Sequence, residues 1–165
     1  MARMRMRARV RQRQVMAQSG LAAVTLAIVL LLEDAANVAV MTAVASSAFL
    51  VFAMPSSPMA QVRRLAGGHF VAIAVAFVFS YLLYDSALNE LSEHDFSRDL
   101  VMAACVGTAI AAMCFTRTQH VPAAGTALGL TLAPWAAGAA IAIATTALVL
   151  SVLRCLLRGW LVDLI

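Results

Sequence analysis

The chain has 165 residues, of which 63% are hydrophobic and 12% are charged, and its mean hydropathy is +0.90. Soluble domains carry about 45–50% apolar and roughly 25% charged residues. A water-soluble fold of this length could not bury so much apolar surface, because a small fold leaves a large fraction of its surface exposed. The composition therefore excludes an ordinary soluble domain and indicates a chain that is embedded in a lipid bilayer.

Charged residues are absent from five long segments, namely residues 14–32, 35–62, 65–84, 100–116 and 118–153. A bilayer core of about 30 Å needs roughly 20 apolar residues per helix. Backbone groups in lipid must be paired within their own segment, so these segments should be helical, and the sequence lacks the alternating strands of a barrel. We predict an all-α, polytopic membrane helix bundle. Its five full spans should lie at about 17–32, 36–54, 66–84, 100–116 and 135–154.

The last charge-free segment is too long for one span, and its prolines and glycines argue against one straight helix. We therefore expect a separate short helix at about 122–132. A helix of about 11 residues covers only about 17 Å, so it either crosses next to protein or a water-filled cavity, or is re-entrant. The crossing alternative is favoured, because it leaves Arg154 and Arg158 on the same side as most other arginines.

All twelve basic residues are arginines, and six of them lie in the first 13 residues: Arg3, Arg5, Arg7, Arg9, Arg11 and Arg13. The run could be an organelle targeting peptide, the basic region of a cleaved secretory signal, or a cytoplasmic anchor for the first span. We favour the anchor, since no clean cleavage site precedes Glu33 and Asp34. Nucleic-acid binding is not expected, because no folded basic surface accompanies the run.

This interpretation gives the expected organisation. Residues 1–16 form an Arg-rich cytoplasmic segment, residues 17–157 the transmembrane domain, and residues 158–165 a short C-terminal tail. The protein should be a multi-pass protein of the inner cell membrane with a cytoplasmic N-terminus. The acidic loop from Asp85 to Asp99 should be external.

Two polar breaks, residues 52–69 and 115–129, interrupt the apolar pattern in a similar way. Each follows an apolar helix and contains proline, hydroxyl residues, glutamine, arginine, histidine and glycine. Helix N-termini and backbone groups released by proline or glycine suit an anion, and paired broken segments are typical of transporter binding sites. The candidate substrate-binding residues are Ser56, Ser57, Gln61, Arg63, Gly67, Gly68, His69, Arg117, Thr118, His120, Pro122 and Gly125.

Taken one at a time, these residues also have structural interpretations. The Pro55–Pro58 run could be a plain loop or helix start, and Arg63 and Arg64 could be interfacial positive charges. Each histidine could be an ordinary hydrogen-bonded residue, and Gly67-Gly68 could be a close helix-packing point. The functional interpretation depends on all of them gathering on one side of the membrane.

The sequence contains no catalytic motif, no phosphate loop and no zinc-binding pattern. The three cysteines, Cys105, Cys114 and Cys155, form no CxxC pair and are expected to be small buried hydrophobic residues. Glu93, His94 and Asp95 are expected to be a solvated cluster, with a weak cation site as the alternative. We predict no enzymatic activity, no metal and no cofactor.

The two breaks resemble the two signatures of the HPP transmembrane family. The similarity covers about residues 18–157 and departs from the family pattern at Val62, Arg64, Gln119, Val121 and Ala124. The matching residues are Pro55-Ser56-Ser57-Pro58, Ala60-Gln61, Arg63, Gly67-Gly68-His69, Thr116-Arg117-Thr118, His120 and Pro122-Ala123. The resemblance implies a bundle usually described with four spans, and transport of nitrite in some members.

Two functional hypotheses follow. The first is a permease or channel for a small inorganic anion, with nitrite as the first candidate. The alternative is a non-transporting assembly or sensory subunit that packs against partner helices. A chain of 165 residues has little mass for an aqueous pathway of its own. The expected partners are therefore the lipid bilayer, a small anion and further copies of the chain in a homo-oligomer.

Overall fold

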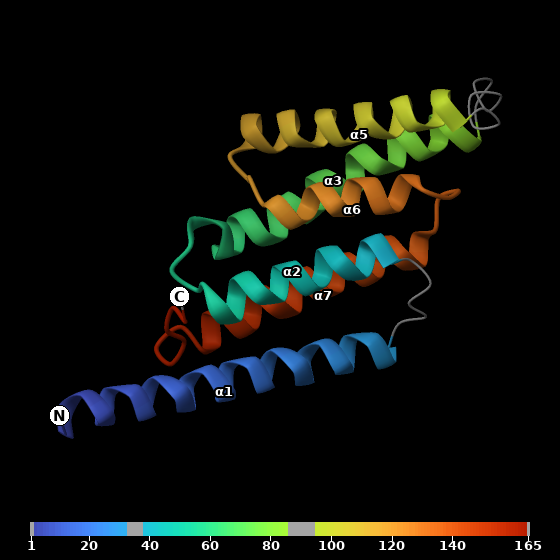
Figure 1. The fold of residues 1–165 in the computed structure, drawn as a ribbon. Coiled ribbons are helices and arrows are strands. Elements are labelled where there is room, and N and C mark those ends of the chain that lie inside the picture. Colours follow the sequence, from blue (N-terminus) through green and yellow to red (C-terminus); the bar gives the residue numbers. More distant parts are fainter. Residues whose placement is uncertain (1, 33–37, 86–94, 165) are drawn as a thin grey trace.

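The computed structural model describes residues 2–32, 38–85 and 95–164. Over these ranges the protein is helical, without strands, and the helices run back and forth along one another (Figure 1). The predicted all-α polytopic bundle is thus confirmed. The elements are α1 (Ala2–Leu32), α2 (Val38–Ala53), the 3-10 helix η1 (Pro58–Ala60), α3 (Val62–Tyr84), α5 (Asp95–Thr116), α6 (Val121–Thr131) and α7 (Ala137–Leu156).

Five full spans were predicted, but only three of the described helices, α3, α5 and α7, are long and apolar enough to cross a membrane. They have 23, 22 and 20 residues, against roughly 20 for a bilayer core. The apolar part of α2 and the whole of α6 are shorter. In α1, the predicted first span and the Arg-rich segment before it form one continuous helix of 31 residues.

The short helix α6 extends across the bundle beside α3 and in the same direction (Figure 1). At its N-terminal end, His120 approaches Gly68 in the second turn of α3. At its C-terminal end, the Tyr84 hydroxyl donates a hydrogen bond to the carbonyl of Thr131 over 3.4 Å. The arrangement fits the crossing alternative for this helix rather than the re-entrant one.

Two helices begin earlier than the charge-free segments predict. Helix α3 begins at Val62, not near residue 66, so Arg63 and Arg64 lie in its first turn. Helix α5 begins at Asp95, not near residue 100. The Asp95 carboxylate forms an ion pair with the Arg98 guanidinium, with a nitrogen–oxygen distance of 2.7 Å. An acidic residue in a first turn is favourable because it faces the positive end of the helix dipole. The prediction erred because helices continue past the apolar core into polar surroundings.

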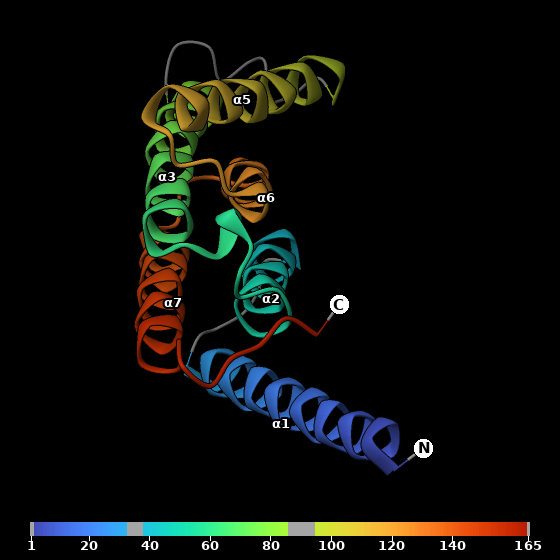
Figure 2. The ribbon, with the colours of Figure 1, turned by 90° about the vertical axis from the view of Figure 1, so that its left-hand side faces the viewer.

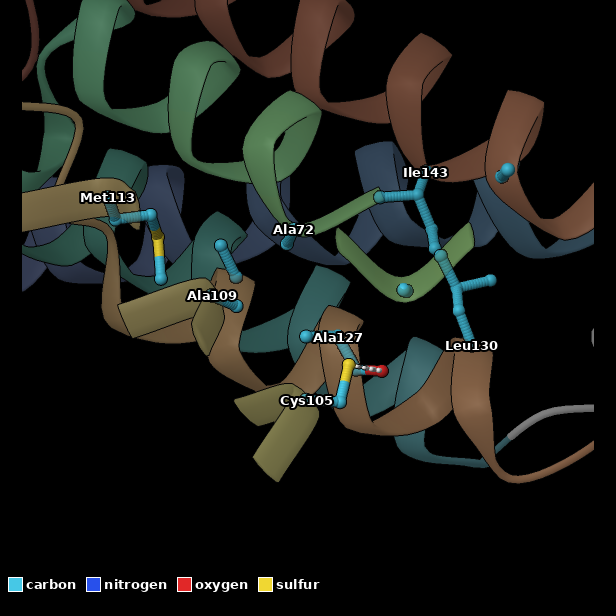
Figure 3. Close-up of a cluster of buried hydrophobic side chains, with 10 residues drawn as sticks. Ala72, Cys105, Ala109, Met113, Ala127, Leu130 and Ile143 are labelled. Carbon is cyan, nitrogen blue, oxygen red and sulfur yellow. Dashed lines mark hydrogen bonds between the residues drawn. The ribbon is translucent and has the colours of Figure 1, made fainter. Parts of the chain in front are cut away.

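The interior consists of two apolar clusters, of which the larger is rich in small side chains. The larger cluster joins α3, α5, α6 and α7, and Figure 3 shows part of it around Cys105, Ala109 and Ala127. Small residues let helices in a membrane approach closely, since packing rather than water exclusion holds them together. The smaller cluster joins α2, α3, α7 and the tail; its buried members are Ala48, Val51, Phe52, Leu65, Ala147, Leu150 and Leu161.

Large apolar side chains also cover the outside of the bundle. Phe115 is 88% exposed, Phe96 and Leu156 are each 76% exposed, and Ile141 is 65% exposed. A soluble monomer rarely presents so much apolar surface. These faces are the expected lipid contacts of the predicted membrane bundle.

The C-terminal residues after α7 return to the bundle and pair with the backbone of α2. The Leu164 amide donates to the Ala53 carbonyl over 2.9 Å. Gln18 of α1 is fully buried; its amide nitrogen donates to the carbonyls of Phe52 and Val162, and its amide oxygen accepts from the Val162 amide at 3.1 Å. We call Gln18 with these two backbone partners the Gln18 junction.

The end of the bundle where α2, α5 and α7 finish and α3 and α6 begin faces the viewer in Figure 2. Arg63 and Arg64 in the first turn of α3 and Arg154 in the last turn of α7 lie at this end. Arg98 lies at the opposite end, near the start of α5. We call the first of these ends the basic end. The predicted turn at Glu33-Asp34 and most of the acidic loop, including Glu93 and His94, lie outside the described residues.

Candidate functional site

The two polar breaks meet at the basic end of the bundle. Gly67 and Gly68 of α3 lie against Thr118 and His120, which precede α6. A Cβ atom on Gly67 would lie 2.7 Å from the Thr118 Cγ2 atom, and one on Gly68 would lie 2.6 Å from the His120 Cβ atom. Real side chains do not approach so closely, so glycine is required for this contact. Both glycines therefore lie within the regular helix α3 and permit its close contact with the second break, so their backbone is not opened.

Two histidines, one from each break, meet in the interior. The rings of His69 and His120 have centroids 5.1 Å apart and are inclined at 63°. The Ser47 hydroxyl, from the middle of α2, lies 2.9 Å from His69 Nε2 and 3.0 Å from His120 Nε2. His69 Nδ1 lies 2.9 Å from the Thr126 hydroxyl of α6. We call Ser47, His69, His120 and Thr126 the histidine cluster.

The histidine cluster is shielded from solvent and internally paired. Its side chains are between 0% and 2% exposed. The remaining ring nitrogen, His120 Nδ1, donates to the Met59 carbonyl of η1 over 2.9 Å. All four ring nitrogens thus have a partner, as buried polar groups require. The cluster joins α2, α3, η1 and α6 around one set of polar atoms.

Local sequence explains how the second break presents its residues. The amide of Thr118 donates to the Met113 carbonyl over 2.9 Å, and the amide of Arg117 donates to the Cys114 carbonyl over 3.2 Å. This pair of bonds is a Schellman motif, which ends a helix with one residue in the left-handed region. Arg117 is that residue, with a φ of 57°. Glycine is usual there, so Arg117 holds a conformation that costs a non-glycine residue about 1–2 kcal/mol.

The arginines of the basic end stay near the surface. The guanidinium of Arg63 donates to the Thr116 carbonyl at the end of α5 over 3.2 Å, and that of Arg154 donates to the Pro55 carbonyl over 2.9 Å. Cations near the last carbonyls of a helix are favourable. Arg63 and Arg117 have exposed side chains. Arg63 and Arg117 therefore lie at the surface of the basic end, whereas His69 and His120 are buried.

The remaining predicted site residues have separate structural positions. Ser57 caps η1, with its hydroxyl accepting from the Met59 amide at 3.3 Å. Ser56 is exposed, and its amide donates to Asp163 of the tail over 3.0 Å. Gln61 is exposed at the start of α3 and caps it without a side-chain hydrogen bond. Pro122 is buried at the start of α6, and Gly125 faces Ala43 of α2.

Thr118 links the surface of the site to its interior. Its side chain is 8% exposed and lies 2.7 Å, oxygen to oxygen, from the hydroxyl of Thr116. The Thr116 carbonyl accepts the bond from Arg63. The predicted residues Arg63, Thr118, Gly67, Gly68, His69 and His120 thus form one contiguous group.

Sequence reasoning missed Ser47, Thr126 and the Met59 carbonyl. Ser47 and Thr126 lie inside apolar helices, where a hydroxyl usually bonds to a carbonyl of its own helix. The one feature of the sequence that could have indicated Ser47 is its position in α2, where it shares a buried helix face with Ala43, Val44 and Ala48. Among the described residues, no group of three or more His, Cys, Asp or Glu side chains could hold a metal ion.

This arrangement defines a class of protein. Apolar helices of membrane length, an outward-facing apolar surface and a buried polar cluster make the chain a multi-pass integral membrane protein. The sequence model of the family described as "HPP, transmembrane region" matches residues 7–164. The chain therefore belongs to the HPP transmembrane family, which confirms the resemblance found in the two breaks.

Curated relatives agree at the level of class. One transmembrane protein of Dictyostelium discoideum is 38% identical over 85 residues, which is 51% of this chain and 24% of the relative. A second transmembrane protein of the same organism is 36% identical over 85 residues, 51% of this chain and 27% of the relative. The matched region thus covers about a quarter of the length of these relatives. No solved structure matches the chain significantly.

Proposed function

We propose that this protein moves a small inorganic anion across the membrane, with nitrite as the first candidate. The observation that carries the proposal is the meeting of the two breaks, which gathers exposed arginines above a buried cluster of hydrogen-bonding side chains. Polar and ionisable residues in the interior of a membrane bundle are expensive and tend to mark substrate pathways. Paired interruptions of apolar helices point in the same direction.

Charge at the basic end favours an anionic substrate. Arg63 and Arg117 are exposed at the basic end, and α3 and α6 both begin there with the positive ends of their dipoles. Arg117 keeps a strained backbone conformation where glycine would fit without strain. Strained residues cluster at functional sites, so a required positive charge accounts for arginine at this position.

The proposal includes an orientation and an assembly. The basic end would face the cytoplasm of the cell that carries the protein in its inner membrane, as the positive-inside rule expects. A homo-oligomer would supply the additional helices that a pathway through such a small chain needs. Native mass spectrometry of the detergent-solubilised protein measures this; a single copy per particle would remove the oligomer from the proposal.

The test is nitrite and nitrate flux into proteoliposomes that contain the purified protein. Saturable flux is expected, and Arg117→Ala should lower it about tenfold, since one charge-assisted contact contributes about 1.5–3 kcal/mol. Arg98→Ala is the matched control, because Arg98 lies at the opposite end and pairs with Asp95. Equal flux in wild type, Arg117→Ala and Arg98→Ala would place the pathway elsewhere.

Absence of flux for every small anion, from protein shown to be folded and inserted, would overturn the transport proposal. The alternative is then an assembly or sensory subunit whose outward apolar faces contact partner helices. That outcome would leave the membrane fold and the family unchanged.

A further inference from the structure

The Met59 carbonyl fixes the direction of the hydrogen bonds in the histidine cluster. A carbonyl oxygen can only accept, so the His120 Nδ1 atom, 2.9 Å away, must carry a proton. In a neutral ring the other nitrogen, Nε2, then has a lone pair and needs a donor. The Ser47 hydroxyl, 3.0 Å away, is the group that can donate to it.

The same reasoning sets the second ring. Because Ser47 uses its single proton on His120, its oxygen accepts from His69 Nε2, 2.9 Å away. His69 is then protonated at Nε2, so its Nδ1 atom accepts from the Thr126 hydroxyl, also 2.9 Å away. With both rings neutral, the chain has one consistent direction, from Thr126 through His69, Ser47 and His120 to the Met59 carbonyl. The two histidines must be opposite tautomers.

Ser47 also has a second acceptor. Its hydroxyl lies 2.8 Å from the Ala43 carbonyl, one turn earlier in α2. If His120 Nε2 gains a proton, that nitrogen becomes a donor to Ser47, and the Ser47 proton turns to Ala43. Among the described residues, Thr126 has no such second acceptor. His120 is therefore the ring that can bind an added proton with every polar atom still paired.

We propose that the histidine cluster is a proton-binding site, which takes up one proton at His120 Nε2 while the Ser47 hydroxyl switches from His120 to the Ala43 carbonyl. One N–H bond forms with a proton from solvent, and no other covalent bond changes. The site requires no anion, so the inference goes beyond the proposed function.

The surroundings limit the site to one added proton. A second would place two cationic rings with centroids 5.1 Å apart in a buried site, where like charges repel strongly. Helices α2 and α6 and the 3-10 helix η1 carry no charged residue. The other described charged side chains on or next to the packed helices lie at the two ends of the bundle: Arg63, Arg64, Arg117, Arg154 and Arg158 at the basic end, and Asp85, Asp95, Arg98 and Asp99 at the ends of α3 and α5 away from it.

The uncharged titratable side chains on these elements form no hydrogen bond with the two histidine rings. Cys105 of α5 donates to the Ala127 carbonyl, and Tyr81 and Tyr84 lie in the last turn of α3. Cys114 and Cys155 are exposed, so the expectation that all three cysteines are buried was correct for Cys105 alone. Among the described residues, no carboxylate contacts the two rings, so a bound proton would add an uncompensated positive charge. On the basis of the proposed function, a small anion bound beside His120 would neutralise that charge, which couples anion movement to a proton.

The test is nitrogen-15 NMR of the imidazole rings in the full-length protein, reconstituted in phosphatidylcholine nanodiscs without added nitrite. A His94→Gln background leaves the two histidines of the cluster as the only ring signals. At the neutral end of a pH titration, His120 should be protonated at Nδ1 and His69 at Nε2. On acidification, His120 alone should gain its second N–H proton.

Ser47→Ala should remove the switch. At a fixed pH in the titration, the protonated fraction of His120 should fall roughly tenfold, because the charged ring loses a hydrogen bond worth about 1.5–3 kcal/mol. Ser46→Ala is the matched control, since the Ser46 hydroxyl bonds to the Thr42 and Ala43 carbonyls of its own helix. Its ring signals should equal those of the parent protein.

Three results would overturn the inference: identical tautomers in the two rings, protonation of His69 first, or two neutral rings until the protein unfolds. These readings come from the parent protein, so they decide the question even if Ser47→Ala does not fold. The measurement contains no transport step. Loss of nitrite flux with an intact titration would therefore count against the proposed function alone.

Discussion

The histidine cluster and the Gln18 junction are both buried polar sites in an apolar bundle, yet they differ in what they can do. Gln18 uses its amide on backbone groups of Phe52 and Val162, whose donor and acceptor roles are fixed. The histidine cluster pairs side chains with one another, and the roles of His69, His120 and Ser47 can reverse. The first site can only hold segments together, whereas the second can change its proton content while every polar atom stays paired.

The two sites also hold the segments of the basic end together in different ways. At the Gln18 junction, residues more than 100 positions apart are joined by one amide side chain. At the histidine cluster, the hydrogen bonds depend on close helix packing, because His120 fits beside α3 only where Gly68 lacks a side chain. Substitutions at the two sites should therefore destabilise the protein for different physical reasons. The substitutions below are ordered from the largest expected effect on stability to the smallest.

Gly68→Ala should have the largest effect on stability. Its Cβ atom would meet the His120 Cβ atom at 2.6 Å and the Thr118 carbonyl oxygen at 2.9 Å, so α3 and the second break must move apart. Overpacking of this kind costs about 1–3 kcal/mol, and contact with backbone argues for the upper part of that range. Thermal unfolding in detergent would measure the loss, and the ring signals of His69 and His120 should shift.

Gly107→Ala is the control for this prediction. Gly107 lies within α5, and apart from its own stretch of helix nothing described lies within 4 Å of a Cβ atom placed there. Alanine also favours a helix over glycine by roughly 0.5–1 kcal/mol. If Gly68→Ala and Gly107→Ala destabilise the protein equally, glycine at position 68 is not required for the close approach of the two breaks.

Gln18→Ala should cost about 2 kcal/mol, since it leaves the buried carbonyl of Phe52 and the part-buried amide and carbonyl of Val162 without their side-chain partner. The residues after α7 should then be cut faster by protease. Gln12→Ala, on an exposed position of the same helix, should change neither stability nor cleavage. If Gln18→Ala also changes the protonation of His120, the two sites are coupled and the comparison fails.

Much of the fold could be predicted from where charges are absent. The charge-free segments located α2, α3, α5, α6 and α7 to within a few residues, because lipid forces apolar segments into helices. Proline and glycine separated α6 from α7. The helix starts at Val62 and Asp95 could not be read this way, since a helix continues into the interface wherever its end groups are satisfied.

The site was predictable in part. His69, His120 and Gly68 lie in breaks that stand out against apolar sequence. Ser47 does not, because Ser46 beside it has the same chemistry and bonds only to its own helix. Which of the two serines faces the histidines depends on how α2 packs against α6. Gln18 had no signal either, because its partner Val162 is 144 positions away and lies beside it only through the packing of the tail against α2.

Substitution of Arg117 should have the smallest effect on stability, and it distinguishes a structural role of this residue from a role in transport. It occupies the left-handed position of a Schellman motif, with a φ of 57°. Arg117→Gly should relieve the strain and stabilise the protein by about 0.5–1 kcal/mol, after allowing for the greater freedom of glycine in the unfolded chain. Arg117→Ala keeps the strain and should bring no such gain. Thermal unfolding compares the two.

Nitrite flux then gives the second half of the test. Both variants lose the positive charge at position 117, so both should lose nitrite flux to the same extent. This is expected even though Arg117→Gly should be the more stable of the two. Full flux in Arg117→Gly would mean that the arginine serves neither the anion nor the fold, and the strained position would be left without a functional reason. Loss of flux in the more stable variant would show that the chain retains a strained arginine, where glycine fits better, for the sake of its charge.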